Sequence, residues 1–279
     1  MSGLFASNLF RRVLTAVVVL PAVAAAIVLF PQRGPWVLAA LLGILGIGEA
    51  HSLLGGADLR ASHLSFLPGI ALFFEIAGLP DAAQAFPISG LPVVAVVAAA
   101  LAAVMRADRF GIPVLAAEAA GVLAGLLMGL GAGSFAALSS LRPMGDGVAR
   151  IVLLLAVVIA SDVFAYFVGH AIGRHKLAPV VSPGKSIEGA IGGLVGGGLA
   201  AALVGALLFK DQPLAVIVLV GLLVTTAGIA GDLLESLFKR YVGAKHSGTL
   251  FPGHGGVLDR IDSFILAAPL IYAFFKTVS

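Results

Sequence analysis

The chain has 279 residues, of which 60% are hydrophobic and only 11% charged, and its mean hydropathy is +1.10. A soluble protein of this length needs more charge to cover its surface, so the composition excludes a large soluble domain and predicts an integral membrane protein. The absence of cysteine excludes a disulfide framework, and the formal charge of +3 is interpreted as a loop-orientation signal, not as nucleic-acid binding.

Apolar segments recur along the whole chain and predict about nine transmembrane helices, beginning from a cytoplasmic N-terminus. Prolines between the apolar runs mark several of the boundaries, and the fifth segment is long enough to contain a break at its glycines. The fold class is therefore expected to be an all-α polytopic membrane protein. The predicted helices cover residues 13–30, 36–54, 64–79, 90–105, 112–139, 149–172, 189–209, 214–235 and 257–276.

Two regions are expected along the chain. Residues 1–140 are predicted to supply N-terminal transmembrane helices that face lipid and could form a dimer contact, and residues 141–279 a C-terminal catalytic region. Alternating nine helices across the membrane places most of the lysines and arginines on the cytoplasmic side, as the positive-inside rule requires. The same alternation places the most charged segment of the chain, Gly231 to Asp262, on that side.

This charged segment lies between two apolar ones. Phe264–Phe275 is too short to span a bilayer, which takes about 20 residues, so the first turns of the last helix must include Asp259 and Asp262. These two are three residues apart and share a helical face. At the end of the preceding long segment the same holds for Asp232, Glu235, Ser236 and Lys239. Because charge beside a bilayer is costly unless it has a function, the segment is predicted to form a functional site.

The residue types in this segment favour phosphate chemistry. One or two carboxylates, completed by water and substrate phosphate, are the usual ligands of Mg²⁺. Nearby lysines and arginines would neutralise phosphates, and glycines let backbone amides approach an anion. The residues alone therefore predict metal-assisted phosphoryl or nucleotidyl transfer at the membrane surface. The alternative is that the basic residues only flank a helix and set its orientation.

Two ordered motifs resemble those of the phosphatidate cytidylyltransferases, also called CDP-diacylglycerol synthases. The first motif comprises Ser236, Lys239, Arg240, Lys245, His254, Gly255, Gly256, Asp259, Arg260 and Asp262. The second comprises Ser161, Asp162, Tyr166, Gly169, Leu177, Pro179, Ser182, Pro183, Lys185, Ser186, Glu188 and Gly189.

The resemblance implies the conversion of CTP and phosphatidate into CDP-diacylglycerol and pyrophosphate in phospholipid biosynthesis. It implies Mg²⁺, at two divalent sites held by Asp232 and Asp259, and a monovalent cation such as K⁺. The implied location is the bacterial inner membrane, with the active site facing the cytoplasm, a membrane lipid as substrate, a homodimer and no nucleic-acid partner. The implied catalytic residues are Lys239, Arg240, Lys245, Arg260 and Asp262, and the implied substrate-binding residues are Asp162, Ser182, Lys185, Ser186, Ser236, His254, Gly255 and Gly256.

The chain departs from the family pattern at two positions. His246 stands where the family normally has Asp, and it cannot supply the same hard oxygen ligand. If the missing Asp were a metal ligand, activity or metal preference would change, whereas if it only oriented the loop, the protein would remain active. Ser186 replaces the usual Thr and keeps the hydroxyl.

Other features leave alternatives open. Glu49, Glu75 and Glu118 lie in apolar segments without a matching motif and could be protonated in the interior, make helix contacts or line a polar path. Small residues from Gly189 to Gly197 recur at helical spacing, which favours close helix packing over a dimer face or lipid-tail groove. Intramembrane acids also fit a transporter or channel, and His246 would fit a catalytically silent scaffold.

Overall fold

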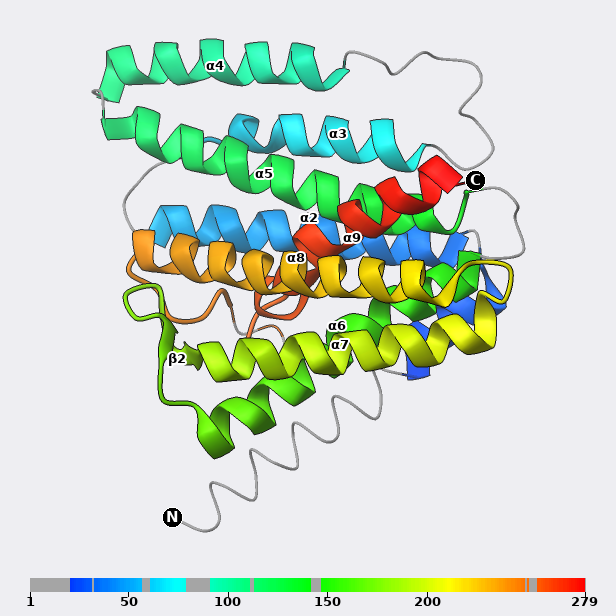
Figure 1. Cartoon of the computed structure of the whole chain (residues 1–279). Coiled ribbons are helices and arrows are strands. Elements are labelled where there is room, and N and C mark those ends of the chain that lie inside the picture. Colours follow the sequence, from blue (N-terminus) through cyan, green and yellow to red (C-terminus); the bar gives the residue numbers. More distant parts are fainter. Residues whose placement is uncertain are drawn as a thin grey trace. The chain divides into compact units, whose positions relative to one another are not determined.

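The protein is built almost entirely of helices, as the computed structural model in Figure 1 shows for residues 21–31, 33–56, 61–78, 91–110, 113–141, 147–248, 250 and 255–278. Residues 21–29 are helical, and every segment predicted as a helix from the sequence overlaps one in the structure. The elements that follow are α2 (Arg33–Gly56), η1 (His63–Phe66), α3 (Leu67–Ala77), α4 (Leu91–Phe110), α5 (Pro113–Leu138), α6 (Gly147–Ile172), β1 (Lys176–Ala178), β2 (Ser182–Ser186), α7 (Ile187–Leu208), α8 (Leu214–Tyr241) and α9 (Leu258–Val278).

Within the described residues, six helices are long and apolar enough to cross a membrane: α2, α5, α6, α7, α8 and α9. The chain is therefore an integral membrane protein. Two shorter apolar helices cover His63–Ala77 and Val94–Ala107. The nine spans and the cytoplasmic N-terminus stay predictions. The fifth predicted segment contains no break, since α5 is continuous over its glycines.

The chain divides into two compact units, Met1–Ala137 with Tyr241–Ile261 and Leu138–Arg240 with Asp262–Ser279. In the first unit, α3 and α5 cross with their backbones in contact. A Cβ at Gly69 would collide with the carbonyl of Gly125, and one at Gly129 would collide with the carbonyl of Gly69. Trp36 packs edge-on against Phe73, with ring centroids 5.5 Å apart. Glycine thus permits a closeness that any side chain would prevent.

In the second unit, α6 and α7 pack against each other through the glycines of α7. A Cβ at Gly189 would lie 2.9 Å from the carbonyl oxygen of Ala165, and one at Gly193 would lie 3.0 Å from Oγ of Ser161. These glycines are buried. The interpretation of the glycine pattern as a close-packing surface is confirmed.

A short antiparallel hairpin precedes α7. β1 pairs with β2 in a register that sets Lys176 opposite Ser186 and Ala178 opposite Ser182. No strand was expected here, so the all-α prediction is confirmed apart from this hairpin. β2 continues into α7 without an intervening loop (Figure 1), and Oγ of Ser186 accepts a 3.1 Å hydrogen bond from the backbone N–H of Gly189. Such a bond is the usual N-terminal cap of a helix.

The last two helices extend beyond their apolar runs. The 21 residues of α9 include Asp259 and Asp262 in its first turns, as the length argument predicted. α8 continues to Tyr241, past the predicted end of the membrane-spanning segment at residue 235, and Lys239 and Arg240 lie in its last turn. The polar ends of both helices are therefore ordered by the same backbone hydrogen bonding as their apolar parts.

Candidate active site

Carboxylates from three helices gather in the second unit. A Cβ at Gly231 would lie 2.5 Å from the backbone oxygen of Asp262, so α8 and α9 cross in direct contact at this point. The carboxylate of Asp262 interacts electrostatically with those of Asp232 and Glu235 on α8 and of Asp162 on α6. Three of these four are site residues predicted from the sequence, and the helix crossing brings them together.

Lys185 supplies positive charge to this cluster from the hairpin. It lies in β2, and its Nζ is 2.5 Å from Oδ2 of Asp232, with about a quarter of each side chain exposed. Ser236, one turn further along α8, donates to Oδ1 of Asp232 over 3.5 Å. The predicted residues Lys185, Asp232 and Ser236 are therefore neighbours in the structure.

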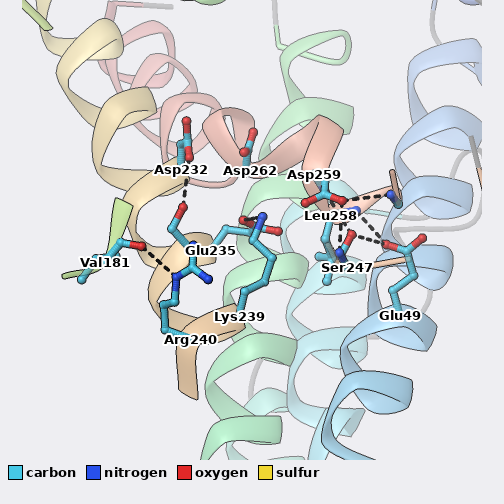
Figure 2. A network of polar contacts seen from close by, with 12 residues as sticks. Glu49, Val181, Asp232, Glu235, Lys239, Arg240, Ser247, Leu258, Asp259 and Asp262 are labelled. Atoms are coloured by element: carbon cyan, nitrogen blue, oxygen red, sulfur yellow. Dashed lines mark hydrogen bonds and ion pairs between the residues drawn. The ribbon is translucent and has the colours of Figure 1, made fainter. Parts of the chain in front are cut away.

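Two further predicted cations have partners in the structure, of which only Glu235, beside Lys239 on the same helical face, was indicated by the sequence. Nζ of Lys239 is 2.6 Å from Oε2 of Glu235 one turn away, and the Glu235 side chain is only 3% exposed. Nε of Arg240 donates a 3.2 Å hydrogen bond to the carbonyl of Val181, as Figure 2 shows. Arg240 thus fastens the hairpin to the end of α8.

In the first unit, Asp259 organises the loop before α9, which here means the described residues between α8 and α9: 242–248, 250 and 255–257. Its Oδ2 accepts hydrogen bonds from the backbone N–H groups of Ser247, at 3.1 Å, and Gly256, at 3.0 Å. Gly255 has a φ of 83°, a conformation that favours glycine. The backbone amide at Gly256 was expected to approach an anion, and here that anion is the side chain of Asp259.

Glu49 on α2 binds the same loop, although it belongs to neither motif. Its Oε1 accepts from the N–H of Val257 at 2.8 Å. Its Oε2 accepts from the N–H of Leu258 and from Oγ of Ser247, both at 3.0 Å (Figure 2). The available signal was an acid inside an apolar helix, which requires partners. Nothing in the sequence identified those partners some 200 positions away.

The remaining predicted site residues have varied surroundings. Lys245, Arg260 and Asp162 are exposed, whereas Ser186 is 7% exposed and caps α7. Ser182 begins β2. His254 lies outside the described residues. The catalytic and binding roles of the whole predicted set stay predictions.

The donor chemistry of the second unit fits a hard divalent cation. No group of three or more His, Asp or Glu side chains forms a ready metal site in the part of the chain that the structure describes. However, Asp232 and Asp262 present carboxylates to one helix crossing, and Mg²⁺ is commonly held by one or two carboxylates with water and substrate phosphates.

Comparison with known proteins identifies the family of the chain. The profile of a family described as the cytidylyltransferase family matches residues 10–278. A phosphatidate cytidylyltransferase of Brucella abortus is 47% identical over 153 residues, covering 52% of this chain and 55% of the relative. Proteins with the same name from Staphylococcus haemolyticus and Haemophilus influenzae are 44% and 43% identical, over 45% and 46% of this chain and 48% and 46% of their own lengths.

The chain therefore spans about half the length of the curated relatives it matches. The family match is more extensive, since it covers nearly the whole sequence and includes both motifs and the acids of the helix crossing. The chain belongs to the cytidylyltransferase family.

Proposed function

We propose that this membrane protein is a metal-dependent phosphatidate cytidylyltransferase, which converts CTP and phosphatidate into CDP-diacylglycerol and pyrophosphate. The observation that carries the proposal is the gathering of Asp162, Asp232 and Asp262 beside Lys185 on helices that are apolar enough to span a membrane. Ionisable groups in such helices mark functional sites, because their burial is costly. The names of the relatives give the substrates of those relatives and support the same choice here.

The proposed reaction is one displacement. A phosphate oxygen of phosphatidate attacks the α-phosphorus of CTP and forms a new P–O bond. The bond between the α-phosphorus and its bridging oxygen to the β-phosphate breaks, and pyrophosphate leaves with that electron pair. When bound, Mg²⁺ would neutralise the phosphates and the leaving pyrophosphate. At its two proposed sites Asp232 would hold one ion and Asp259 the other, with K⁺ as an accompanying monovalent ion.

The protein's own groups orient and neutralise the substrates. Lys185 is poised to exchange the carboxylate of Asp232 for a phosphate oxygen, because an ammonium group bonds to either. Lys239, Arg240 and Arg260 are proposed to neutralise the triphosphate and the lipid phosphate. We place the reaction at the cytoplasmic face of a bacterial inner membrane, in phospholipid biosynthesis, with the enzyme as a homodimer.

The test is synthesis of lipid product by the purified chain in detergent. With radiolabelled CTP, phosphatidate and Mg²⁺, the label is expected to move into CDP-diacylglycerol. Asp232→Asn should lower the rate at least about 100-fold. Asp211→Asn is the matched control, because Asp211 is exposed outside the helices and should leave the rate unchanged. Absence of labelled lipid with wild-type protein across several divalent cations would overturn the proposal and favour a transporter or scaffold.

A further inference from the structure

The side chain of Glu49 on α2 holds the loop that leads into α9 by accepting hydrogen bonds from it. Among the residues that the structure describes, its partners are the N–H groups of Val257 and Leu258 and the hydroxyl of Ser247, and each of them donates to the carboxylate. The hydroxyl of Ser247 also accepts from the N–H of Asp259, at 3.3 Å. A carboxylate has acceptor sites on both oxygens, so it can satisfy all these donors.

These contacts occur where a helix has unsatisfied N–H groups. α9 begins at Leu258, and the N–H groups of its first turn have no carbonyl partner within the helix. Glu49 therefore acts as a helix cap from a distant part of the chain, and its negative charge lies at the positive end of the helix dipole. It fixes both the starting residue and the direction of the turn that carries Asp259.

Two loop glycines are explained by the space that Glu49 occupies. Among the described residues, neither Gly248 nor Gly256 is a positive-φ glycine, so backbone conformation does not require glycine at either position. A Cβ at Gly248 would lie 2.6 Å from Oε1 of Glu49, and the three atoms nearest to it all belong to Glu49. A Cβ at Gly256 would collide with Oε2 of Glu49 and with Oγ of Ser247. The last glycine of the Gly255–Gly256 pair is thus fitted to a carboxylate that lies outside both motifs.

We infer that Glu49 is a positioning residue for the transfer reaction, which locks the loop and the first turn of α9 in the arrangement that presents Asp259 and Arg260. This inference rests on the proposed function. Glu49 acts through the loop, and its removal leaves the substrates bindable but misplaced. The expected effect is therefore on kcat rather than on the amount of folded protein.

The first experiment compares Glu49→Gln with wild type and with Glu75→Gln, an exposed acid on α3 of the same unit. Whichever end the new amide group occupies, its NH₂ faces a backbone donor. The kcat per folded molecule should fall on the order of 10- to 100-fold, as for small misplacements of reacting groups, while the KM for CTP changes less than about threefold. Glu75→Gln should match wild type. An unchanged kcat in Glu49→Gln would overturn the inference.

The second experiment requires no substrate and so separates this inference from the proposed function. Hydrogen exchange at the amides of Val257 and Leu258, measured on the full chain in detergent, should be at least about tenfold faster in Glu49→Gln, with helix α7 unchanged. If wild type makes no CDP-diacylglycerol but exchange at these two amides is still faster in Glu49→Gln, then Glu49 holds the start of α9 and the proposed function is wrong. Equal exchange rates in the two proteins would show that Glu49 does not hold the start of α9, and would overturn the inference.

A double-mutant cycle covers the case in which Glu49→Gln does not accumulate. Gly248→Ala keeps the Glu49 carboxylate, but the added methyl group would displace it. In the wild-type background this variant should lower kcat at least about fivefold. In a Glu49→Ala background, where the colliding atoms are gone, adding Gly248→Ala should change kcat less than about twofold. Gly248→Ala with wild-type kcat would contradict the inference whether or not the Glu49 variants fold.

Discussion

Nζ of Lys185 lies 2.5 Å from Oδ2 of Asp232, so the short hairpin and helix α8 are joined by an ion pair inside the predicted site. Each side chain is about one quarter exposed, which leaves room for a phosphate or a metal ion to compete for its charge. In this pair each side chain neutralises the charge of the other, and both are proposed to change partner when substrate binds.

Replacing Lys185 with Met should lower kcat/KM for CTP at least about tenfold, because a phosphate oxygen loses its ammonium partner and Asp232 loses its counter-charge. Lys176→Met is the matched control, since Lys176 lies exposed on β1 of the same hairpin and has no predicted role. Steady-state kinetics with both variants measure this. Equal losses in the two would mean that the hairpin needs positive charge in general and not at residue 185.

Replacing Gly231 with Ala should destabilise the protein by about 1–3 kcal/mol, because the added methyl would lie 2.5 Å from the backbone oxygen of Asp262 and would force α8 and α9 apart. Gly228→Ala, one turn earlier, would make only ordinary contacts at 3.6 Å or more and should be neutral or slightly stabilising. Thermal unfolding in detergent compares the two. If both glycines tolerate alanine equally, α8 and α9 are not in direct contact at Gly231.

Replacing Ser186 with Ala should cost about 0.5–2 kcal/mol of stability, because the N–H of Gly189 loses the hydroxyl that caps α7. Ser186→Thr keeps a hydroxyl and should stay close to wild type. The same variants separate two roles for Ser186. A loss of CTP affinity in Ser186→Ala, with unchanged stability, would favour direct substrate binding over capping.

Replacing His246 with Asp, the residue usual in the family, should leave the apparent Mg²⁺ affinity and the rate within about twofold. His246 is exposed, and the adjacent N–H of Ser247 is already fixed by Asp259, so the loop does not need a carboxylate at 246 to hold its course. A Mg²⁺ titration of the two proteins measures this. A markedly tighter metal response in His246→Asp would indicate that residue 246 faces the metal.

The helices were predictable because their cause is local. Apolar runs of membrane-spanning length, interrupted by proline, predict helices whatever their neighbours are, and the short apolar run before the C-terminus required Asp259 and Asp262 to be helical. The hairpin was not predictable in this way. Its strands have only three and five residues, too few for a periodic pattern. The hairpin is also held by the bond from Arg240 to Val181, two residues that are far apart in sequence.

The same distinction applies to the site. The family resemblance predicted that Lys185, Asp232 and Asp262 belong to one site, and the structure brings all three into the second unit. Glu49 was found in the sequence only as an isolated acid in an apolar helix. Its partners are two backbone N–H groups and one serine hydroxyl. Because every residue except proline has a backbone N–H, the residue types do not show which N–H groups will bind it.

The direct continuation of β2 into α7 has a mechanical consequence. Lys185 immediately precedes the residue that caps α7, so no loop lies between this lysine and a helix of membrane-spanning length. Membrane helices tilt to match the thickness of the surrounding hydrocarbon. A change of tilt in α7 would therefore move Lys185 as well, and with it the positive charge that is paired with Asp232.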